Sequence, residues 1–154
     1  MKIYIQVMCK KKIFFPDKKY FLLWLKKIFK KNKVEITIRL VSIKEITYLN
    51  KKYRKKNVPT NVLSFPSTEN INIKHQFSNY IGDIILSPNY INKEALLLKK
   101  NRLEHWAHII IHSALHLLHY THKNKKSRNI MQNIEKKIMI QLGFDDPYKT
   151  SNIN

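Results

Sequence analysis

Three histidines near the C-terminal end of the chain have a spacing that could bind a metal ion. His112, His116 and His122, called the histidine trio below, stand in the segment HSALHLLHYTH with the pattern H-x3-H-x5-H. Residues four apart lie on one face of a helix, and a third imidazole just beyond the helix end can swing back toward that face. Three imidazole nitrogens suit a zinc ion whose fourth position is open to water. The pattern therefore predicts one Zn²⁺ per chain, in a catalytic rather than a structural site.

The chain has seven histidines, and the other four give weaker signals. His119 could compete for the metal, but three nitrogens and a water already complete a tetrahedron, so we expect a helix-terminal or surface histidine there. His108 is one turn before the first member of the trio, where packing or support of a ligand is favoured over ligation. His105 and His75 carry no usable signal.

The residues around the trio indicate which reactions a zinc ion there could catalyse. A zinc ion lowers the pKa of bound water from about 16 to about 7 and polarises an oxygen of the group that is cut. Metalloproteases need a glutamate directly after the first histidine as general base, and Ser113 occupies that position. Phosphodiester hydrolysis instead needs a fixed cation for the phosphate, and Arg54 is the best candidate. We therefore expect zinc-activated water to attack a phosphodiester while Arg54 offsets charge on the phosphorane, and no carboxylate stands out as general base.

The composition is strongly basic. The 154 residues include 30 Lys and Arg against 10 Asp and Glu, a net charge of +20. Such an excess favours a polyanionic partner, because clustered cations release counterions from phosphate backbones. Codon bias toward Lys, Asn and Ile is an equal alternative, since the lysines are spread from Lys2 to Lys149.

Length and cysteine content set further bounds. A chain of 154 residues is about one domain with a single core. Cys9 is the only cysteine, which excludes an internal disulfide and a cysteine-based zinc site and favours a reducing compartment. The N-terminal segment lacks the form of a signal peptide, and the apolar run at 21–25 is too short to span a bilayer. We therefore predict a cytoplasmic protein with no membrane partner.

Hydrophobic periodicity predicts the elements that must position the trio. Strands are expected at residues 2–7, 34–40, 62–65 and 80–86. Helices are expected at about 17–30, 43–56, from Ser87 and Pro88 onward, at 103–118 and at about 127–142, with Gly143 as the last stop. A polar loop containing His75 is expected from Pro66 to about Asn79. This order predicts a single α+β domain with a mixed sheet of about four strands and about five helices, and a zinc site at the C-terminal end of a core helix.

Several segments together carry a family resemblance. WAHIIIHSALHLLHYTH (106–122) resembles the signature of the YbeY family of zinc-dependent endoribonucleases, approximately H-G-x-L-H-L-x-G-Y-D-H. LNKKYRKKNVPTNVLSFP (49–66), IGDIIL (81–86) and EKKIMIQLGFDDPY (135–148) are similar to the family's other characteristic segments, in the same order. The resemblance covers almost the whole chain and implies one metal-dependent hydrolase domain over residues 1–154.

The resemblance also implies an activity and site residues. It implies a single-strand-specific endoribonuclease in 16S ribosomal RNA 3′-end maturation and ribosome quality control, with one zinc bound by His112, His116 and His122. The implied partners are ribosomal RNA and the small ribosomal subunit, with a ribosomal protein or a ribosome-assembly GTPase. The family's functional arginine falls on Arg54, and its first motif histidine, implicated in activity, falls on His112. Asp83, beside the presumed cleft, falls on a family position linked to partner contact.

Three residues depart from the family pattern. Ser113 and His119 replace the two motif glycines, and Thr121 replaces the aspartate before the last histidine. His119 stands at a helix-ending position where glycine tolerates positive φ, so we expect strain there or a shifted third-ligand loop. Thr121 lacks a carboxylate that could orient a ligand, and such a loss typically costs about 10- to 100-fold in metal affinity or activity.

Two other functions remain open on the sequence alone. One is a different zinc hydrolase acting on a peptide or a small ester, which Ser113 in place of glutamate disfavours. The other is a basic ribosome-associated RNA-binding protein that keeps the fold but has weakened catalysis.

Overall fold

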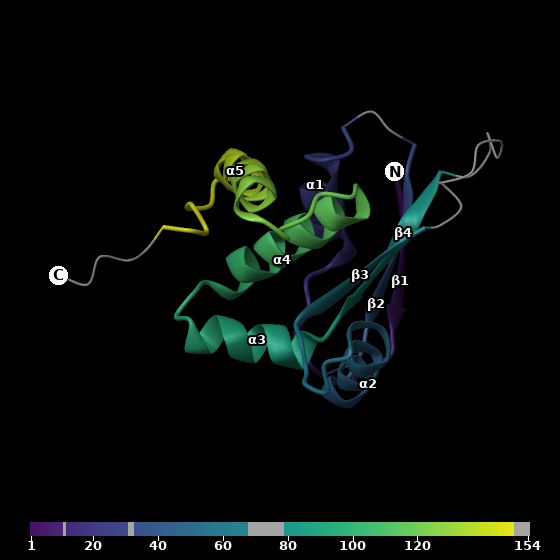
Figure 1. The fold of residues 1–154 in the computed structure, drawn as a ribbon. Helices are drawn as coiled ribbons and strands as arrows, with labels where there is room; N and C mark the ends of the chain where they lie inside the picture. Colours follow the sequence, from purple (N-terminus) through teal and green to yellow (C-terminus); the bar gives the residue numbers. More distant parts are fainter. Residues whose placement is uncertain (11, 31–32, 68–78, 150–154) are drawn as a thin grey trace.

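Helices cover both faces of a four-stranded sheet (Figure 1). The computed structural model describes residues 1–10, 12–30, 33–67 and 79–149, so most of the polar loop expected around His75 lies outside the described residues. The strands β1 (Lys2–Val7), β2 (Glu35–Leu40), β3 (Val62–Pro66) and β4 (Tyr80–Leu86) lie in the order β1-β2-β4-β3. β1, β2 and β4 run parallel, and β3 lies antiparallel to β4 at one edge. The predicted mixed sheet of an α+β fold is confirmed.

Five helices accompany this sheet within the described ranges. They are α1 (Lys18–Lys26), α2 (Ile43–Arg54), α3 (Pro88–Leu97), α4 (Arg102–Leu117) and α5 (Lys125–Gln141). In Figure 1, α1 and α4 lie over one face of the sheet and α2 lies on the other. Among the described residues, no helix combines the length and the apolar character that a bilayer crossing requires.

Most predicted helix boundaries shift by one or two residues, and α2 ends at Arg54 rather than at 56. The boundaries of α1 and α5 differ for a local reason. α1 ends at Lys26 rather than near residue 30, and the N–H of Phe29 bonds to the Leu25 carbonyl at 3.0 Å as the chain turns to bury the Phe29 ring. α5 begins two residues earlier than expected. There the Asn124 side chain accepts a hydrogen bond from the Ser127 N–H, and the Ser127 side chain bonds back to the Asn124 backbone. This reciprocal cap satisfies backbone donors that a helix start otherwise leaves unpaired.

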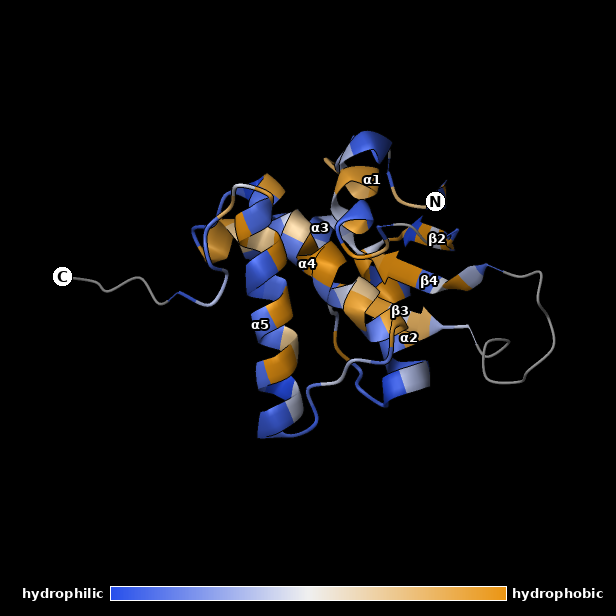
Figure 2. Ribbon diagram, turned by 90° about the horizontal axis from the view of Figure 1, so that it is seen from above, coloured by the Kyte–Doolittle hydropathy of each residue, from blue (hydrophilic) through white to orange (hydrophobic). Residues whose placement is uncertain are grey.

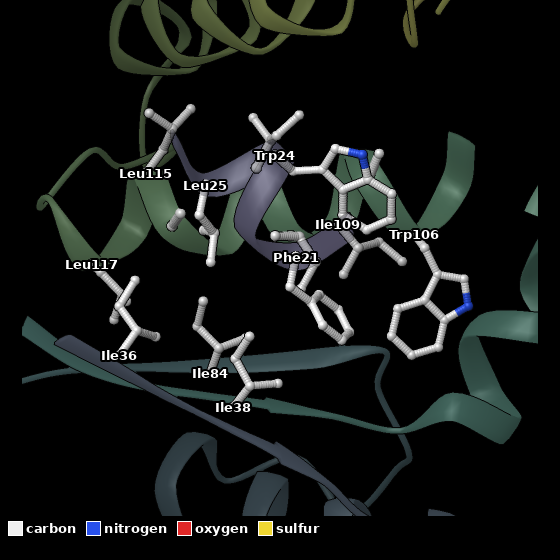
Figure 3. Packing of buried hydrophobic residues seen from close by; sticks show 14 of the residues in the cluster. Phe21, Trp24, Leu25, Ile36, Ile38, Ile84, Trp106, Ile109, Leu115 and Leu117 are labelled. Atoms are coloured by element: carbon white, nitrogen blue, oxygen red, sulfur yellow. The ribbon is translucent and has the colours of Figure 1, made fainter. Parts of the chain in front are cut away.

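The helix α4 is the central element of the fold. Trp106 packs edge-on against Phe21 of α1, with 6.2 Å between ring centroids, and its Nε1 donates to Asn92 of α3 at 2.8 Å. Figure 3 shows the α1 and α4 side chains packed above Ile36 and Ile84 of the sheet. Figure 2 shows apolar residues concentrated where α4 meets the strands, and hydrophilic residues over much of α2 and α5. The partly exposed residues His108, His112 and His116 form one strip along α4, called its open strip below. Because the rest of α4 is mostly buried, the backbone that carries this strip is held in a fixed position.

Gly82 allows the end of α4 to approach the sheet. Its φ is +143°, and an added Cβ would lie 2.3 Å from the Phe65 carbonyl oxygen and 2.9 Å from Cδ2 of Leu117. The first of these neighbours is backbone and cannot rotate away. Leu117 is the last residue of α4, so this contact brings the helix end, with its histidines, against the edge where β3 lies.

We expect Gly82→Ala to lower the free energy of unfolding by about 2–4 kcal/mol, because the new methyl group overlaps backbone and the φ suits only glycine. Gly143→Ala is the matched control, since Gly143 has a φ of +85° but no atom within 4 Å of an added Cβ. That change should cost only the positive-φ penalty of about 1–2 kcal/mol. Urea denaturation measures both, and equal losses would contradict the close approach at Gly82.

Candidate metal centre

The C-terminal end of α4 brings the histidine trio into one cluster. His112 and His116 lie one turn apart on α4, and His122 lies in the segment between α4 and α5. One nitrogen from each ring lies within 4.8 Å of the other two. The Nε2 atoms of His112 and His116 are 3.0 Å apart. The structure therefore places the three predicted ligands together, at the predicted end of a core helix.

The turn that returns His122 to the helix contains the expected positive φ. His119 has a φ of 68°. Its N–H bonds to the His116 carbonyl at 2.9 Å, and the Tyr120 N–H bonds to the Leu115 carbonyl at 3.1 Å. These two bonds form a Schellman motif, in which the left-handed residue is usually glycine. A side chain there costs about 1–2 kcal/mol, yet the motif still returns His122 to the cluster.

The hydrogen bonds of the first two histidines fix which ring nitrogens carry protons. Nδ1 of His112 donates to the carboxylate of Glu135, and Nδ1 of His116 donates to the Tyr120 carbonyl at 2.9 Å. Both partners are acceptors only, so in the neutral rings the hydrogen lies on Nδ1 and the lone pair on Nε2. Burial and the neighbouring His112 lower the pKa of His116 to about 4, so this ring is neutral at pH 7. When the His112 ring is neutral as well, two Nε2 lone pairs face each other.

This arrangement suits a cation. Two lone pairs at 3.0 Å repel each other unless a positive charge lies beside both. In a tetrahedral zinc site, with zinc–nitrogen bonds of about 2.0–2.1 Å, the ligand nitrogens are about 3.3–3.4 Å apart. The separation of His112 and His116 is close to that value, and His122 offers a third nitrogen. The donor set thus fits a metal ion that favours imidazole ligands.

Glu135 of α5 is the main site residue that the sequence analysis missed. Its side chain is 0% exposed. Its carboxylate accepts hydrogen bonds from Nδ1 of His112 and from the Tyr148 hydroxyl, and it lies 3.6 Å from Nε2 of His108. Burial alone would raise the pKa of this carboxyl, but the nearby His108 and the hydrogen bonds from His112 and Tyr148 lower it to about 2. An ionised carboxylate therefore lies directly behind one candidate ligand.

A sequence signal for Glu135 did exist. On α5 the buried residues Met131, Ile138 and Met139 define the apolar face, and Glu135 lies on that face between them. A charged residue on a buried helix face needs a partner, because its desolvation is otherwise costly. The same contact gives His108 the supporting position expected for it, outside the trio and beside Glu135.

Arg54 and the trio line the same cavity. This cavity has a volume of about 850 Å³, and its walls are β3, the open strip of α4, the end of α2 and the α4–α5 turn. Arg54, the last residue of α2, lies in its lining. Burial and the charges of His112, Arg54 and Arg128 lower the pKa of His122, so that ring too favours its neutral, ligand-competent form. The structure therefore brings the predicted phosphate-binding cation to the predicted metal centre.

Asp83 does not line this cavity, but it pairs in register with Phe65 of β3, which does. Its neighbour Ile84 faces the main core, and strand alternation turns Asp83 to the opposite face of the sheet, where Ile85 packs with Ile46 of α2. There its carboxylate accepts a hydrogen bond from the Tyr80 hydroxyl, which also contacts Oγ1 of Thr37 at 3.2 Å. A partner contact through Asp83 stays a prediction.

Comparisons with known proteins agree with this architecture. Residues 8–143 match a family model described as Endoribonuclease YbeY. A protein of that name from Buchnera aphidicola subsp. Cinara cedri is 64% identical, over 96% of this chain and 95% of its own length. Another, from Buchnera aphidicola subsp. Acyrthosiphon pisum, is 47% identical over 95% and 94%. The solution structure of a Thermotoga maritima protein covers 96% of this chain and 99% of its own, with a TM-score of 0.54 at 24% identity, which shows the shared fold. This chain belongs to the YbeY family, whose model and relatives bear the name endoribonuclease.

Proposed function

We propose that this protein is a zinc-dependent endoribonuclease that cuts single-stranded RNA. The observation that carries the proposal is the pair of Nε2 lone pairs of His112 and His116, 3.0 Å apart in a cavity that Arg54 also lines. A cation between the rings and an arginine nearby are the two positive groups that phosphodiester hydrolysis needs. The names of the relatives support RNA as the substrate.

In this proposal the histidine trio holds the zinc, and other residues hold the trio. Bound zinc would acidify a water molecule and polarise a phosphoryl oxygen. Glu135 fixes the ring of His112, and the Tyr120 carbonyl fixes that of His116. Carboxylate and carbonyl partners of this kind orient metal-binding imidazoles and raise their basicity.

Arg54 would bind the phosphate. Its guanidinium presents donors in a planar fork that matches two phosphate oxygens, and it stays charged at any physiological pH. Placed beside His122, it would hold the scissile phosphate near the metal and offset charge that develops there during attack. His112, as ligand to the same ion, is the second residue on which activity depends.

A peptidase function is not supported. Ser113, where a metalloprotease carries its general base, is fully buried, and its hydroxyl donates to the Ile110 carbonyl at 2.9 Å. A fully buried hydroxyl does not reach water at the metal, and a neutral hydroxyl is too weak a base to take its proton. The alternative of a weakly catalytic RNA-binding protein predicts binding without cleavage even when zinc is added.

We further propose that the substrate is ribosomal RNA. In this role the protein would act in the cytoplasm on the small ribosomal subunit, in 16S ribosomal RNA 3′-end maturation and ribosome quality control. The excess of Lys and Arg supports a polyanionic partner. A ribosomal protein or a ribosome-assembly GTPase would contact Asp83, which does not line the cavity.

Substituting one of the three histidines tests whether the trio binds the zinc ion. Elemental analysis of the purified protein should find one zinc per chain, and His116→Ala should abolish stoichiometric zinc, because two nitrogens hold the ion far less well than three. His119→Gly is the matched control, since it changes a histidine of the same turn, outside the cluster, and relieves a positive φ. Full zinc content in His116→Ala would refute the ligand assignment.

A change at Glu135 tests the support of the ligand. Glu135→Gln keeps the size of the side chain but removes the charge behind His112, so zinc affinity should fall by about 10- to 100-fold. Competition with a chromogenic chelator measures the affinity. Tyr148→Phe removes another hydrogen bond from the same carboxylate and leaves the His112 contact intact, so its loss should be smaller. Unchanged affinity in Glu135→Gln would rule out this supporting role.

Arg54→Ala should slow cleavage of a single-stranded RNA by roughly 100-fold, because the developing charge loses its fixed cation. The zinc content should stay at one per chain. Arg128→Ala removes the other arginine whose charge reaches His122 but which does not line the cavity, and it should have a much smaller effect. Cleavage at the wild-type rate in Arg54→Ala would show that the assigned role is wrong.

A further inference from the structure

Tyr53 is an exposed aromatic side chain inside the cavity. It lies in the last turn of α2, directly before Arg54, and both residues line the cavity. The Tyr53 side chain is 55% exposed. An exposed tyrosine is common on protein surfaces and by itself carries no function. Its place beside the candidate phosphate-binding residue is what sets it apart.

The ring of Tyr53 is held in place from the protein side. Phe65 of β3 packs against it with 5.0 Å between centroids and 69° between ring planes. Phe65 in turn packs on the small core cluster beneath α2 formed by Val41, Ile46, Leu63 and Ile85. An aromatic ring that is fixed before binding loses little conformational entropy when a ligand stacks on it.

A cation also lies beside this ring. Nζ of Lys52 is 5.3 Å from the ring centroid of Tyr53. The last turn of α2 thus joins an open aromatic surface to the positive charges of Lys51, Lys52 and Arg54. Proteins that bind single-stranded nucleic acids combine the same two features, aromatic rings for the bases and cations for the backbone.

Two other exposed tyrosines line the cavity, and each contacts the metal centre, Tyr148 through its side chain and Tyr120 through its backbone. The Tyr148 hydroxyl donates to Glu135, and the Tyr120 carbonyl accepts from His116. The ring contacts of Tyr53 are with Phe65 and Lys52 rather than with the trio or Glu135. Of these three tyrosines, Tyr53 is the one directly beside Arg54 in the chain.

We propose that Tyr53 stacks on the base of the nucleotide next to the scissile phosphate, while Arg54 contacts that phosphate. The inference rests on the proposed function, because it takes single-stranded RNA as the ligand. Bases in a single strand are free to leave their neighbours and stack on an aromatic ring, whereas paired bases in a duplex are not. Tyr53 therefore contributes both affinity and a preference for single strands, and it tolerates any base, since every base has a π face.

The test measures binding of the full chain to a short, end-labelled single-stranded RNA, with a chelator present so that no cleavage occurs. Tyr53→Leu keeps an apolar side chain against Phe65 but removes the ring, and it should weaken binding by roughly 5- to 150-fold. Tyr53→Phe should bind within about twofold of the wild type, because stacking needs the ring and not the hydroxyl. Tyr48→Leu is the matched control, since Tyr48 is 61% exposed on the same helix and lies outside the cavity lining.

An abasic scan of the RNA separates stacking from a general loss of binding. Removing the contacted base should weaken wild-type binding, and the same removal should have little effect on Tyr53→Leu, because the partner ring is already gone. With zinc restored, Tyr53→Leu should raise KM more than it lowers kcat, and zinc content should not change.

The possible failures are distinguishable. The inference would be overturned if Tyr53→Leu bound RNA with wild-type affinity, or if removing the base weakened binding equally in both proteins. Either result would leave the proposed function standing. A wild-type protein that does not bind single-stranded RNA would overturn both.

Discussion

Glu135 places an ionised carboxylate in a fully buried position behind His112, and the candidate metal centre depends on that one contact. A buried charge is tolerated only when its lone pairs are satisfied. Here His112 and Tyr148 donate to it, and His108 lies close by. The carboxylate fixes the proton of His112 on Nδ1 and turns its Nε2 lone pair toward His116. The packing of α5 against α4 is therefore also what prepares the ligand set.

The fold builds the floor and the rim of this site from different elements. α4 is surrounded by α1, α3, α5 and the sheet, so His112 and His116 are carried by a helix that is buried along most of its length. Gly82 lets the end of that helix touch β4, and the edge strand β3 forms the facing wall of the cavity. The rim is built from helix ends and a turn, which present Arg54 and Tyr53 on one side and His122 on the other. Precise ligand geometry and an open route for a flexible substrate thus come from different parts of the fold.

In the structure part of the basic charge gathers near the cavity, whereas along the sequence the lysines are spread over the whole chain. Basic residues occupy the last turn of α2, beside the cavity, and the start of α5, directly after the segment that carries His122. Other lysines stand far from the site, in β1 and in α1. Charge around the cavity supports an RNA substrate, while the scattered remainder is what codon bias would also produce.

Periodicities and spacings within short segments were enough to predict the strands, the helices, the histidine trio and the family resemblance. They also predicted the positive φ at His119, since the helix-ending turn is a local motif. The residues that support the trio could be found only from the packed fold. Glu135 lies 23 residues from His112, and their contact exists because α5 packs on α4. The packed fold also decided on which face of the sheet Asp83 lies. Its neighbour Ile84 enters the core, so Asp83 lies on the opposite face. Long-range packing decides such contacts, and no spacing within a segment encodes them.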